Sequence, residues 1–532
     1  FDSGDTIMTQ IFIKADQDSP AAHAIDANSG DQLTIGPSAT ISAEGGFSAI
    51  DAAVGVTNVE MQIYGTLYGD NAINIEDTGA TGGDSILVAH TGNIIGEAAG
   101  IKNLSGDVSI VNEGSISGNS YGIAMSGSEN TITNSGSITG GSNSAIWVDG
   151  TNDLIVNSGT IEAGLNGNGI QFAGTDVNDA NVVYNSGVIG GAAHNANGFD
   201  WTAIESDVGY ASVHNSGEIQ GKIVLDGASG GVIHNSGTID GFVFFGDGDS
   251  YLGNSGQLDV GVQFGNGDNE FSNSGRVNSQ VSFGDGNDLV VNSGTLDGDL
   301  VFGNGNGSEV INSGHINSEI VFGTGANAVL NHGLMTYGIE FSGAASNYVA
   351  NTGTIDGDID FGSGNDAYHG ARGIENGTVF GGDGNDALRG GDGENRLDGG
   401  LGADRLNGGA DADVFVYGAA AESDGASHDT IAHFDANSDM FDLNVRVTVV
   451  DAALNTGTLS SGAHFDSALT TTFAHLRAHH AVLYTPSAGN EANHTFLIVD
   501  ANGHAGYQAG ADYVIELSHA ASLAGLSADS FG

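Results

Sequence analysis

A repeat of 19 or 20 residues runs through the middle of the chain and limits what the chain can fold into. The triplet Asn-Ser-Gly, with the late variants Asn-His-Gly and Asn-Thr-Gly, recurs at Asn215, Asn235, Asn254, Asn273, Asn292, Asn312, Asn331 and Asn351. A second series keeps step with it at Phe245, Phe264, Phe283, Phe302, Phe322, Phe341, Phe361 and Phe380. A period this regular indicates a solenoid, in which each unit buries its apolar face only against its neighbours.

The pattern within one unit indicates strands rather than helices. Around Asn292, the sequence predicts that Val290 and Asn292 point inward and Val291 outward, and two further short runs place Leu296 and Phe302 inward. This alternation with a period of two, closed by glycines, is typical of short β-strands. We therefore expect a β-solenoid with one coil per repeat, an internal column of phenylalanines and a ladder of asparagine amides at a turn.

The charge balance restricts the partners of the chain. Its 532 residues include 66 Asp and Glu but only 10 Lys and Arg, which gives a formal net charge of −56. Binding of nucleic acid needs clustered basic residues, so we expect none, whereas bound cations would relieve the self-repulsion. The chain has no cysteine, which excludes disulfides and thiolate metal sites. No apolar run approaches the length of a membrane span.

Changes in the repeat divide the chain into five predicted segments. These are an N-terminal cap strand (1–30), an irregular β-solenoid with loop insertions (31–212), a regular β-solenoid (213–380), a nonapeptide region (381–417) and a C-terminal cap (418–532). In the first, Thr6–Lys14 is the strand candidate. In the second, we expect Leu165–Ala180 and Gly191–Asp207 to bulge out as loops, and the latter loop contains His194, Phe199 and Trp201.

From Gly381 the period shortens to nine residues. Four units of the form Gly-Gly-x-Gly-x-Asp-x-apolar-x begin at Gly381, Gly390, Gly399 and Gly408, with small departures, and their eighth residues are Leu388, Leu397, Leu406 and Phe415. Glycine-rich turns expose backbone carbonyls, and each turn adds a carboxylate or an amide. Two stacked turns can therefore form an oxygen cage of the kind that Ca²⁺ prefers.

These units resemble the RTX calcium-binding nonapeptide repeat. The resemblance implies a parallel β-roll in which successive nonapeptides alternate between two edges, so that Asp386 would share an ion with Asp404 and Asn395 with Asp413. Asn395 and Asp411 depart from the family pattern, which puts the second pair in doubt. The calcium residues that it implies here are Gly381, Asp383, Asp386, Asp392, Asn395, Gly399, Asp404, Asp411 and Asp413. The fold class predicted is thus all-β, a long parallel β-helix that runs into an RTX β-roll and ends in a β-rich cap.

Residues outside the nonapeptides extend this prediction. Asp366 and Asp288 end Phe-Gly-x-Gly-Asn-Asp turns, so we expect the cation-binding corner to reach down the solenoid to them. Asp500, Asn502 and Asp512 are candidates for a further calcium loop in the cap. The stretches from Asp429 to Leu443 and from Thr495 to Leu517 resemble the segments that close RTX rolls, and the tail from Leu517 to Gly532 resembles a type I secretion signal.

The expected function is that of a secreted, calcium-dependent structural protein on a bacterial cell surface, a surface layer or filament. Its expected partner is a second copy of itself, with an envelope glycan or lipopolysaccharide as a possible anchor. An RTX adhesin that binds cells or glycans is the alternative. A β-helix polysaccharide lyase or epimerase is a weaker one, because such enzymes use bases to neutralise uronates. From Gln32 to Asn351 the only basic residues besides histidine are Lys102, Lys222 and Arg276, so we expect no enzymatic activity.

Overall fold

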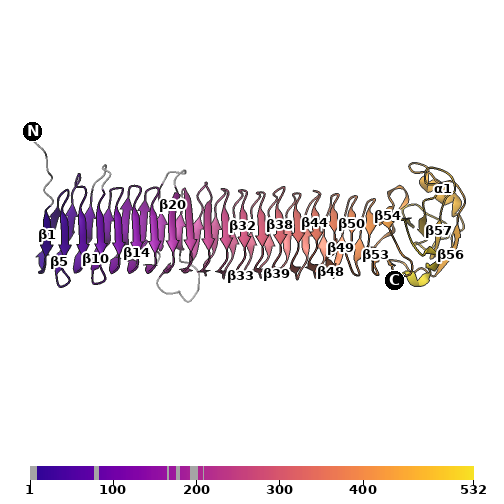
Figure 1. Ribbon diagram of the computed structural model, residues 1–532. Coiled ribbons are helices and arrows are strands. Elements are labelled where there is room, and N and C mark those ends of the chain that lie inside the picture. Colours follow the sequence, from indigo (N-terminus) through magenta and orange to yellow (C-terminus); the bar gives the residue numbers. More distant parts are fainter. Residues whose placement is uncertain (1–8, 77–82, 165–166, 175–179, 192–201, 208) are drawn as a thin grey trace, which may run out of the picture. The chain divides into compact units, whose positions relative to one another are not determined.

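The computed structural model describes residues 9–76, 83–164, 167–174, 180–191, 202–207 and 209–532. These residues form two compact units, Phe1–Gly284 and Asp285–Gly532, which are described separately. In each unit the chain winds as a parallel β-helix whose regular coils carry one strand on each of three faces (Figure 1). The all-β prediction and the parallel β-helix are therefore confirmed.

In the first unit, the strands of the three faces stack in register. The first face comprises β1 (Gln10–Ile13), β4 (Gln32–Ile35), β7 (Glu60–Ile63), β9 (Ser85–Val88), β11 (Ser109–Asn112), β14 (Thr131–Asn134), β17 (Leu154–Asn157), β20 (Ala180–Asn185), β23 (Tyr210–Asn215), β26 (Gly231–Asn235), β29 (Tyr251–Asn254) and β32 (Glu270–Asn273). The second face comprises β2 (Gln17–Ser19), β5 (Thr40–Ala43), β12 (Ser115–Gly118), β15 (Ser137–Gly140), β18 (Thr160–Ala163), β21 (Val188–Gly191), β24 (Glu218–Gln220), β27 (Thr238–Ile239), β30 (Gln257–Leu258) and β33 (Arg276–Val277).

The third face of the first unit follows the same order. It comprises β3 (Ile25–Ala27), β6 (Ile50–Ala52), β13 (Tyr121–Ser126), β16 (Ile146–Asp149), β19 (Ile170–Phe172), β22 (Thr202–Ser206), β25 (Lys222–Leu225), β28 (Val243–Phe245), β31 (Val262–Gln263) and β34 (Val281–Ser282). Two long strands, β8 (Thr66–Ile75) and β10 (Asn93–Asn103), run from the second face into the third.

The second unit begins with the same three faces and then loses one. Its first face comprises β35 (Leu289–Asn292), β38 (Glu309–Asn312), β41 (Ala328–Asn331), β44 (Tyr348–Asn351), β47 (Ala367–His369), β50 (Ala387–Arg389), β52 (Arg405–Asn407) and β54 (Asp429–Ala432). Its third face comprises β37 (Leu300–Val301), β40 (Ile320–Phe322), β43 (Ile339–Phe341), β46 (Ile359–Asp360), β49 (Thr378–Phe380), β51 (Arg396–Asp398), β53 (Val414–Tyr417) and β55 (Met440–Leu443). The second face, which ends first, comprises β36 (Thr295–Leu296), β39 (His315–Ile316), β42 (Leu334–Met335), β45 (Thr354–Ile355) and β48 (Ile374–Glu375).

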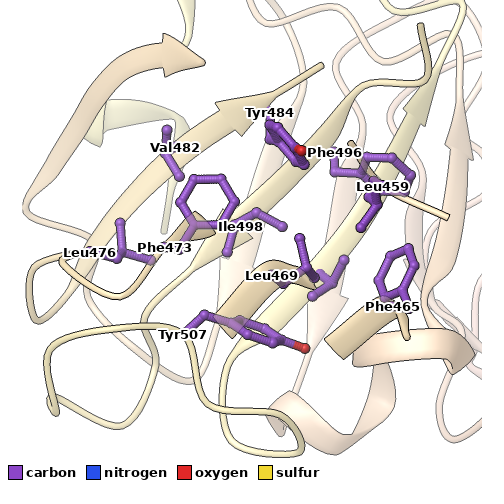
Figure 2. Close-up of a cluster of buried hydrophobic side chains, with 11 residues drawn as sticks. Leu459, Phe465, Leu469, Phe473, Leu476, Val482, Tyr484, Phe496, Ile498 and Tyr507 are labelled. Carbon is purple, nitrogen blue, oxygen red and sulfur yellow. The ribbon is translucent and has the colours of Figure 1, made fainter. Parts of the chain in front are cut away.

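A small mixed sheet and one helix close the second unit. Strands β56 (Val449–Leu454), β57 (His480–Tyr484), β58 (Phe496–Val499) and β59 (Tyr513–Ser518) pair in sequence, and β59 also pairs with β54 of the β-helix. Helix α1 (Phe465–Thr472) packs over this sheet through Phe465 and Leu469, and these side chains join a buried apolar cluster (Figure 2). Short 3-10 turns occur at Ala420–Glu422, Gly425–Ser427, Leu523–Gly525 and Ala528–Ser530. Within the described residues, no helix is long and apolar enough to cross a membrane.

The asparagine ladder is confirmed in both units. Each Nδ2 donates to the Oδ1 of the asparagine one coil later, at 2.7 to 2.9 Å. The ladder of the first unit comprises Asn112, Asn134, Asn157, Asn185, Asn215, Asn235, Asn254 and Asn273, and that of the second comprises Asn292, Asn312, Asn331 and Asn351. All are at most 2% exposed. A buried amide without partners costs about 1 to 3 kcal/mol, which explains why the position keeps one residue type.

The phenylalanine column ends one coil earlier than predicted. In the second unit it comprises Phe302, Phe322, Phe341 and Phe361, whose rings stack at centroid distances of 4.5, 4.9 and 5.3 Å. Phe380 is aligned with Asp360 on an outward position, and Val379 takes the inward one. The prediction for Phe380 is wrong because Gly381 follows it in line with Phe361, where the nonapeptides begin.

Two of the predicted loops contain strands of the third face. β19 lies within Leu165–Ala180 and β22 within Gly191–Asp207, and each pairs in register with its neighbours. The interpretation of these whole ranges as insertions is therefore wrong. Residues 165–166, 175–179 and 192–201, which include His194, Phe199 and Trp201, lie outside the described residues, as do residues 1–8 of the N-terminal segment. The described strand of that segment is β1, which pairs with β4.

One buried position of the second face is acidic. Glu375 is aligned with Ile355 in an otherwise apolar column and is 4% exposed. The Tyr368 hydroxyl lies 3.5 Å from its Oε2, and the Gly377 N–H donates to its Oε1 at 3.2 Å. Burial raises the pKa of Glu375 to about 9, so the side chain carries a proton at neutral pH.

We expect Glu375→Gln to remove part of the pH dependence of stability. The folded protein keeps the Glu375 proton up to about pH 9, whereas the unfolded chain loses it above the ordinary pKa of 4.5. The free energy of unfolding of the wild type therefore falls as pH rises between these values, by roughly 3 kcal/mol at pH 7. Urea unfolding should show the variant more stable than the wild type at pH 8 and similar to it at pH 4. The control is Glu340→Gln, an exposed glutamate on β43; an equal effect there would contradict this account.

Candidate metal centre

The nonapeptides place their strands alternately on two faces of the second unit. β50 and β52 pair on the first face, and β51 and β53 pair on the third. The apolar eighth residues of the repeats are at most 1% exposed and fix the turns from inside. The turns before β50 and β52 therefore stack directly on one another, as do the turns before β51 and β53.

The turn that precedes β47 has the same backbone conformation as the nonapeptide turns. Gly382 and Gly384 have φ of 93° and 148°, and the corresponding Gly362 and Gly364 have φ of 77° and 139°. These values favour glycine strongly. The turns also stack in register, because Ser363 bridges to Asp383, which bridges to Leu401. The turn that ends at Asp366 thus continues the stack of nonapeptide turns by one coil, although it lies outside the nonapeptides.

The first glycine of three nonapeptides leaves room for a carboxylate, whereas the side chain beside Gly390 is the Asn395 amide. A Cβ at Gly381 would lie 2.5 Å from both Asp386 Oδ2 and the carbonyl oxygen of Gly399. A Cβ at Gly399 would lie 2.4 Å from Asp404 Oδ2. Two oxygens from consecutive coils thus converge beside Gly381, in a space that a side chain would fill.

Four aspartates form a continuous column on this corner, which we call the aspartate column. It comprises Asp366, Asp386, Asp404 and Asp429. The Oδ1 atoms of Asp386, Asp404 and Asp429 accept hydrogen bonds from the backbone N–H of the aspartate one coil earlier, at 2.7, 2.8 and 2.8 Å. The Oδ2 atoms of all four form no hydrogen bond with any residue that the structure describes, and the side chains are at most 2% exposed.

Sequence reasoning missed Asp429 as a ligand candidate. The residue is fully buried beside Tyr417. It is the first residue of β54 and aligns with Asp404, which directly precedes β52. It follows Asp404 by 25 residues instead of 18, because residues 418–428 interrupt the period. The only signal in the sequence was its place directly before an apolar-alternating strand, Thr-Ile-Ala.

The electrostatics of the aspartate column call for a cation. Burial raises the pKa of Asp366 and of Asp404 to about 7 each, and it raises that of Asp386 as well. Charged carboxylates in a buried site are stable only when a positive charge or several donors compensate them. Buried Oδ2 atoms beside backbone carbonyls form an oxygen-only ligand set, which suits Ca²⁺ and other hard cations. The residues present therefore fit the calcium ion that the repeat implies.

At the second edge, the amide nitrogen and the amide oxygen of Asn395 both have hydrogen-bond partners within the protein. Its Nδ2 donates to the carbonyls of Gly393 and Gly408 at 2.9 and 3.1 Å, and its Oδ1 accepts from Gly391 N–H at 3.2 Å. The amide nitrogen thus contacts the carbonyl of Gly408, the counterpart of the Gly399 carbonyl in the aspartate column. Asn395 presents no free oxygen, so the geometry speaks against the predicted ion shared with Asp413.

Other predicted ligands lie in different settings. Asp383, Asp392 and Asp411 are exposed, and they can contribute backbone oxygens or long-range charge rather than a buried carboxylate. Asp288 is buried, and its N–H donates to Ser308 Oγ. The column positions between Asp288 and Asp366 are Ser308, Asn327 and Asn347, which carry no carboxylate. An ion at Asp288 stays a prediction.

In the loop between β58 and β59, carboxylate oxygens accept hydrogen bonds from backbone N–H groups. Asp512 accepts from Ala501 N–H and Asn502 Nδ2 on Oδ1 and from Gln508 N–H on Oδ2, at 2.7 to 2.9 Å. Asp500 Oδ1 accepts from Gly503 N–H at 3.0 Å. The structure brings Asp500, Asn502 and Asp512 together as predicted. Donors surround the oxygens of Asp512, whereas Asp500 Oδ2 is buried and has no hydrogen-bond partner among the described residues, as in the aspartate column. A calcium ion in this loop stays a prediction.

Comparison with known proteins supports the metal assignment. Residues 380–415 match the family model of the RTX calcium-binding nonapeptide repeat in four copies. The curated proteins give no match to the chain. Among the described residues, no group of three or more His, Asp or Glu side chains converges as in an all-side-chain metal site. A Ca²⁺ ion at the aspartate column would have the Gly399 carbonyl within reach besides the carboxylates.

We expect Asp404→Asn to lose calcium and to stabilise the calcium-free protein. At Asn327 and Asn347, the same column position carries an amide whose Nδ2 donates to the carbonyl two residues earlier, at 2.8 and 2.9 Å. The variant should adopt this arrangement and no longer need a cation. Calcium counted after equilibrium dialysis should fall by at least one ion per chain, while the melting temperature in excess chelator should rise. Loss of calcium without a gain in chelator would contradict the role of the unpaired Oδ2.

Calcium stoichiometry also tests how far the aspartate column extends. We expect Asp366→Asn and Asp429→Asn each to reduce the number of bound calcium ions, because each removes an unpaired Oδ2 at an end of the column. Asp392→Asn is the matched control, since this aspartate is exposed and should leave the count unchanged. If both end variants bind as much calcium as the wild type, the sites are confined to the nonapeptides.

Proposed function

For a calcium-binding β-helix protein that carries RTX repeats, we propose a secreted structural role at a bacterial cell surface, in which the chain folds and self-assembles when calcium binds outside the cell. The aspartate column is the observation that supports this proposal. It buries four carboxylates in consecutive coils without a compensating basic group among the described residues. Such a site makes calcium part of the folded structure rather than an addition to it.

The dependence on calcium follows from linkage. Ions that bind only the folded chain stabilise it in proportion to their concentration relative to the dissociation constant. Extracellular calcium sites bind at roughly 10⁻⁴ to 10⁻³ M, well above the free calcium of a cytosol. A net charge of −56 opposes compaction further where calcium is scarce. The chain would therefore stay export-competent inside the cell and fold outside it.

Self-assembly accounts for the composition better than catalysis does. With 66 acidic and 10 basic residues, contacts between copies need bridging cations, which calcium provides at the cell surface. The three Lys and Arg residues between residues 32 and 351 offer no clustered base for uronate chemistry. We infer a structural protein without enzymatic activity, and an adhesin remains the competing assignment.

Electron microscopy and light scattering with and without calcium test this proposal. We expect the purified chain to form ordered sheets or filaments when calcium is added and to disperse in chelator. An Asp386→Asn, Asp404→Asn double variant should assemble with a weaker dependence on calcium, because its turns no longer need the ions of the aspartate column. Glu340→Gln serves as the control for removal of an exposed charge. A protein that stays monomeric in calcium yet binds cells or glycans would be an adhesin instead.

A further inference from the structure

One corner of the first unit repeats the hydrogen-bond pattern of the aspartate column. Asn130 and Asp153 directly precede β14 and β17, and Asn181 of β20 is the residue aligned with them one coil later. Asp153 Oδ1 accepts from the Asn130 N–H at 2.8 Å, and the Asp153 N–H donates to Asn181 Oδ1 at 2.9 Å. Asp386 takes part in the same two bonds in the second unit, at 2.7 and 2.8 Å. Asp153 therefore has the local setting of a calcium ligand, although it lies far along the chain from the nonapeptides.

The second carboxylate oxygen of Asp153 has no donor. Asp153 is 2% exposed, and its Oδ2 forms no hydrogen bond with any residue that the structure describes. Asp31, which directly precedes β4, is also buried, but its Oδ2 accepts from the N–H and the Nδ2 of Asn28, at 2.8 and 3.3 Å. The Asn130 Nδ2 donates to the Gly127 carbonyl at 2.8 Å and to Asp153 Oδ1 at 2.9 Å. Asp153 thus lacks the partner that Asp31 and Asn130 have.

A carbonyl oxygen, and not a donor, lies next to this free Oδ2. A Cβ at Gly150 would lie 2.8 Å from Asp153 Oδ2 and 1.8 Å from the carbonyl oxygen of Gly127, so the two oxygens border one space. The relation of Gly399 to Asp404 is similar, with the Oδ2 at 2.4 Å from the position of a Cβ. Neighbouring oxygens repel each other unless a proton or a cation compensates their charge.

A proton compensates Asp153 only in acid. Burial raises the pKa of Asp153 to about 6, and the hydrogen bonds from Asn130 lower it by less. Above this value the folded chain holds a buried carboxylate, which is stable only beside a positive charge or several donors. At neutral pH and above, a cation is therefore the better partner.

We propose that Asp153 binds a calcium ion in the first unit, with backbone carbonyls as further ligands. A carboxylate together with carbonyl oxygens is the hard ligand set that Ca²⁺ prefers. One carboxylate contributes less charge than the stacked aspartates of the second unit, so this site binds calcium more weakly than the aspartate column does. Calcium then stabilises the stack of β14, β17 and β20 directly, independently of the nonapeptides.

Calcium counting and hydrogen exchange on the full chain at pH 7.5 test the proposal. Asp153→Asn should bind about one calcium ion fewer than the wild type at saturation. In the wild type, calcium should slow amide exchange in β17 over a higher concentration range than in β50 and β52, and this second range should disappear in the variant. Asp149→Asn, which removes an exposed aspartate of the same turn, is the matched control. An unchanged count in Asp153→Asn, or an equal loss in Asp149→Asn, would overturn the proposal.

Asn181→Asp tests the same site by a gain that misfolding cannot imitate. This change places a second carboxylate one coil after Asp153, as Asp404 follows Asp386. The calcium concentration that protects β17 should therefore fall by about tenfold, since added ligand charge tightens calcium sites. A concentration that stays the same or rises would show that no ion binds there. If Asp153→Asn alters only the pH dependence of stability and not the calcium count, a proton occupies the place and the proposal is wrong.

These outcomes are separate from the fate of the proposed structural role. Electron microscopy of the same variants in calcium reports on assembly. A chain that binds this ion yet stays monomeric would retain the calcium site in the first unit and lose the structural role. A chain that assembles with an unchanged calcium count in Asp153→Asn would do the opposite.

Discussion

Parallel stacking in register is the constraint on which both units depend. Each residue lies about 4.8 Å from its equivalents in the neighbouring coils, so every column of side chains must be compatible with itself. Apolar residues, phenyl rings and amides meet this condition, since an amide offers both a donor and an acceptor and forms an endless chain. A carboxylate does not, because it offers only acceptors and repels its own copy. A column of aspartates therefore cannot close without something added.

The second unit contains both solutions to this problem. At Asn327 and Asn347, and at Asn395 on the other edge, the side-chain nitrogen donates to nearby carbonyls, and the turn is complete without an ion. At Asp366, Asp386, Asp404 and Asp429 the corresponding oxygen is buried and unmatched by any described residue. The substituent on the side-chain carbonyl carbon, NH₂ or O⁻, thus decides whether the turn is complete without an ion or needs calcium. The chain places the second kind together, next to its C-terminal cap.

Much of this architecture could be predicted from the sequence, because the periodicity itself encodes the stacking. The inward residues Val290, Leu296 and Phe302 and the amide ladder follow from intervals of 19 or 20 residues, and the two-edged roll is what the resemblance to the RTX repeat implies. The errors lie where the interval changes. Phe380 keeps the spacing but changes face, since a nonapeptide glycine replaces the ring. Asp429 was missed as a ligand because an insertion hides its register.

The predicted loops show a second limit of the same kind. β22 was assigned to an insertion because its coil is longer than the others, and length alone does not reveal which part of a coil still pairs. The Asn395 site shows a third limit. Whether an amide replaces a cation depends on the carbonyls within its reach, and one of these, that of Gly408, is contributed by a different repeat. Such contacts follow from the three-dimensional turn and not from the motif.

The direction of the asparagine ladder has a consequence for how such a chain can change in length. Every amide nitrogen points toward the higher-numbered neighbour, so each rung presents a donor on one side and an acceptor on the other. A duplicated or deleted rung leaves the remaining rungs with the same complementary sides. Insertion or deletion of whole coils therefore costs little free energy in the interior of the β-helix. Insertion or deletion of part of a coil would put every column of side chains out of register. Each coil of the β-helix thus acts like the repeating unit of a polymer, with all units joined in one backbone.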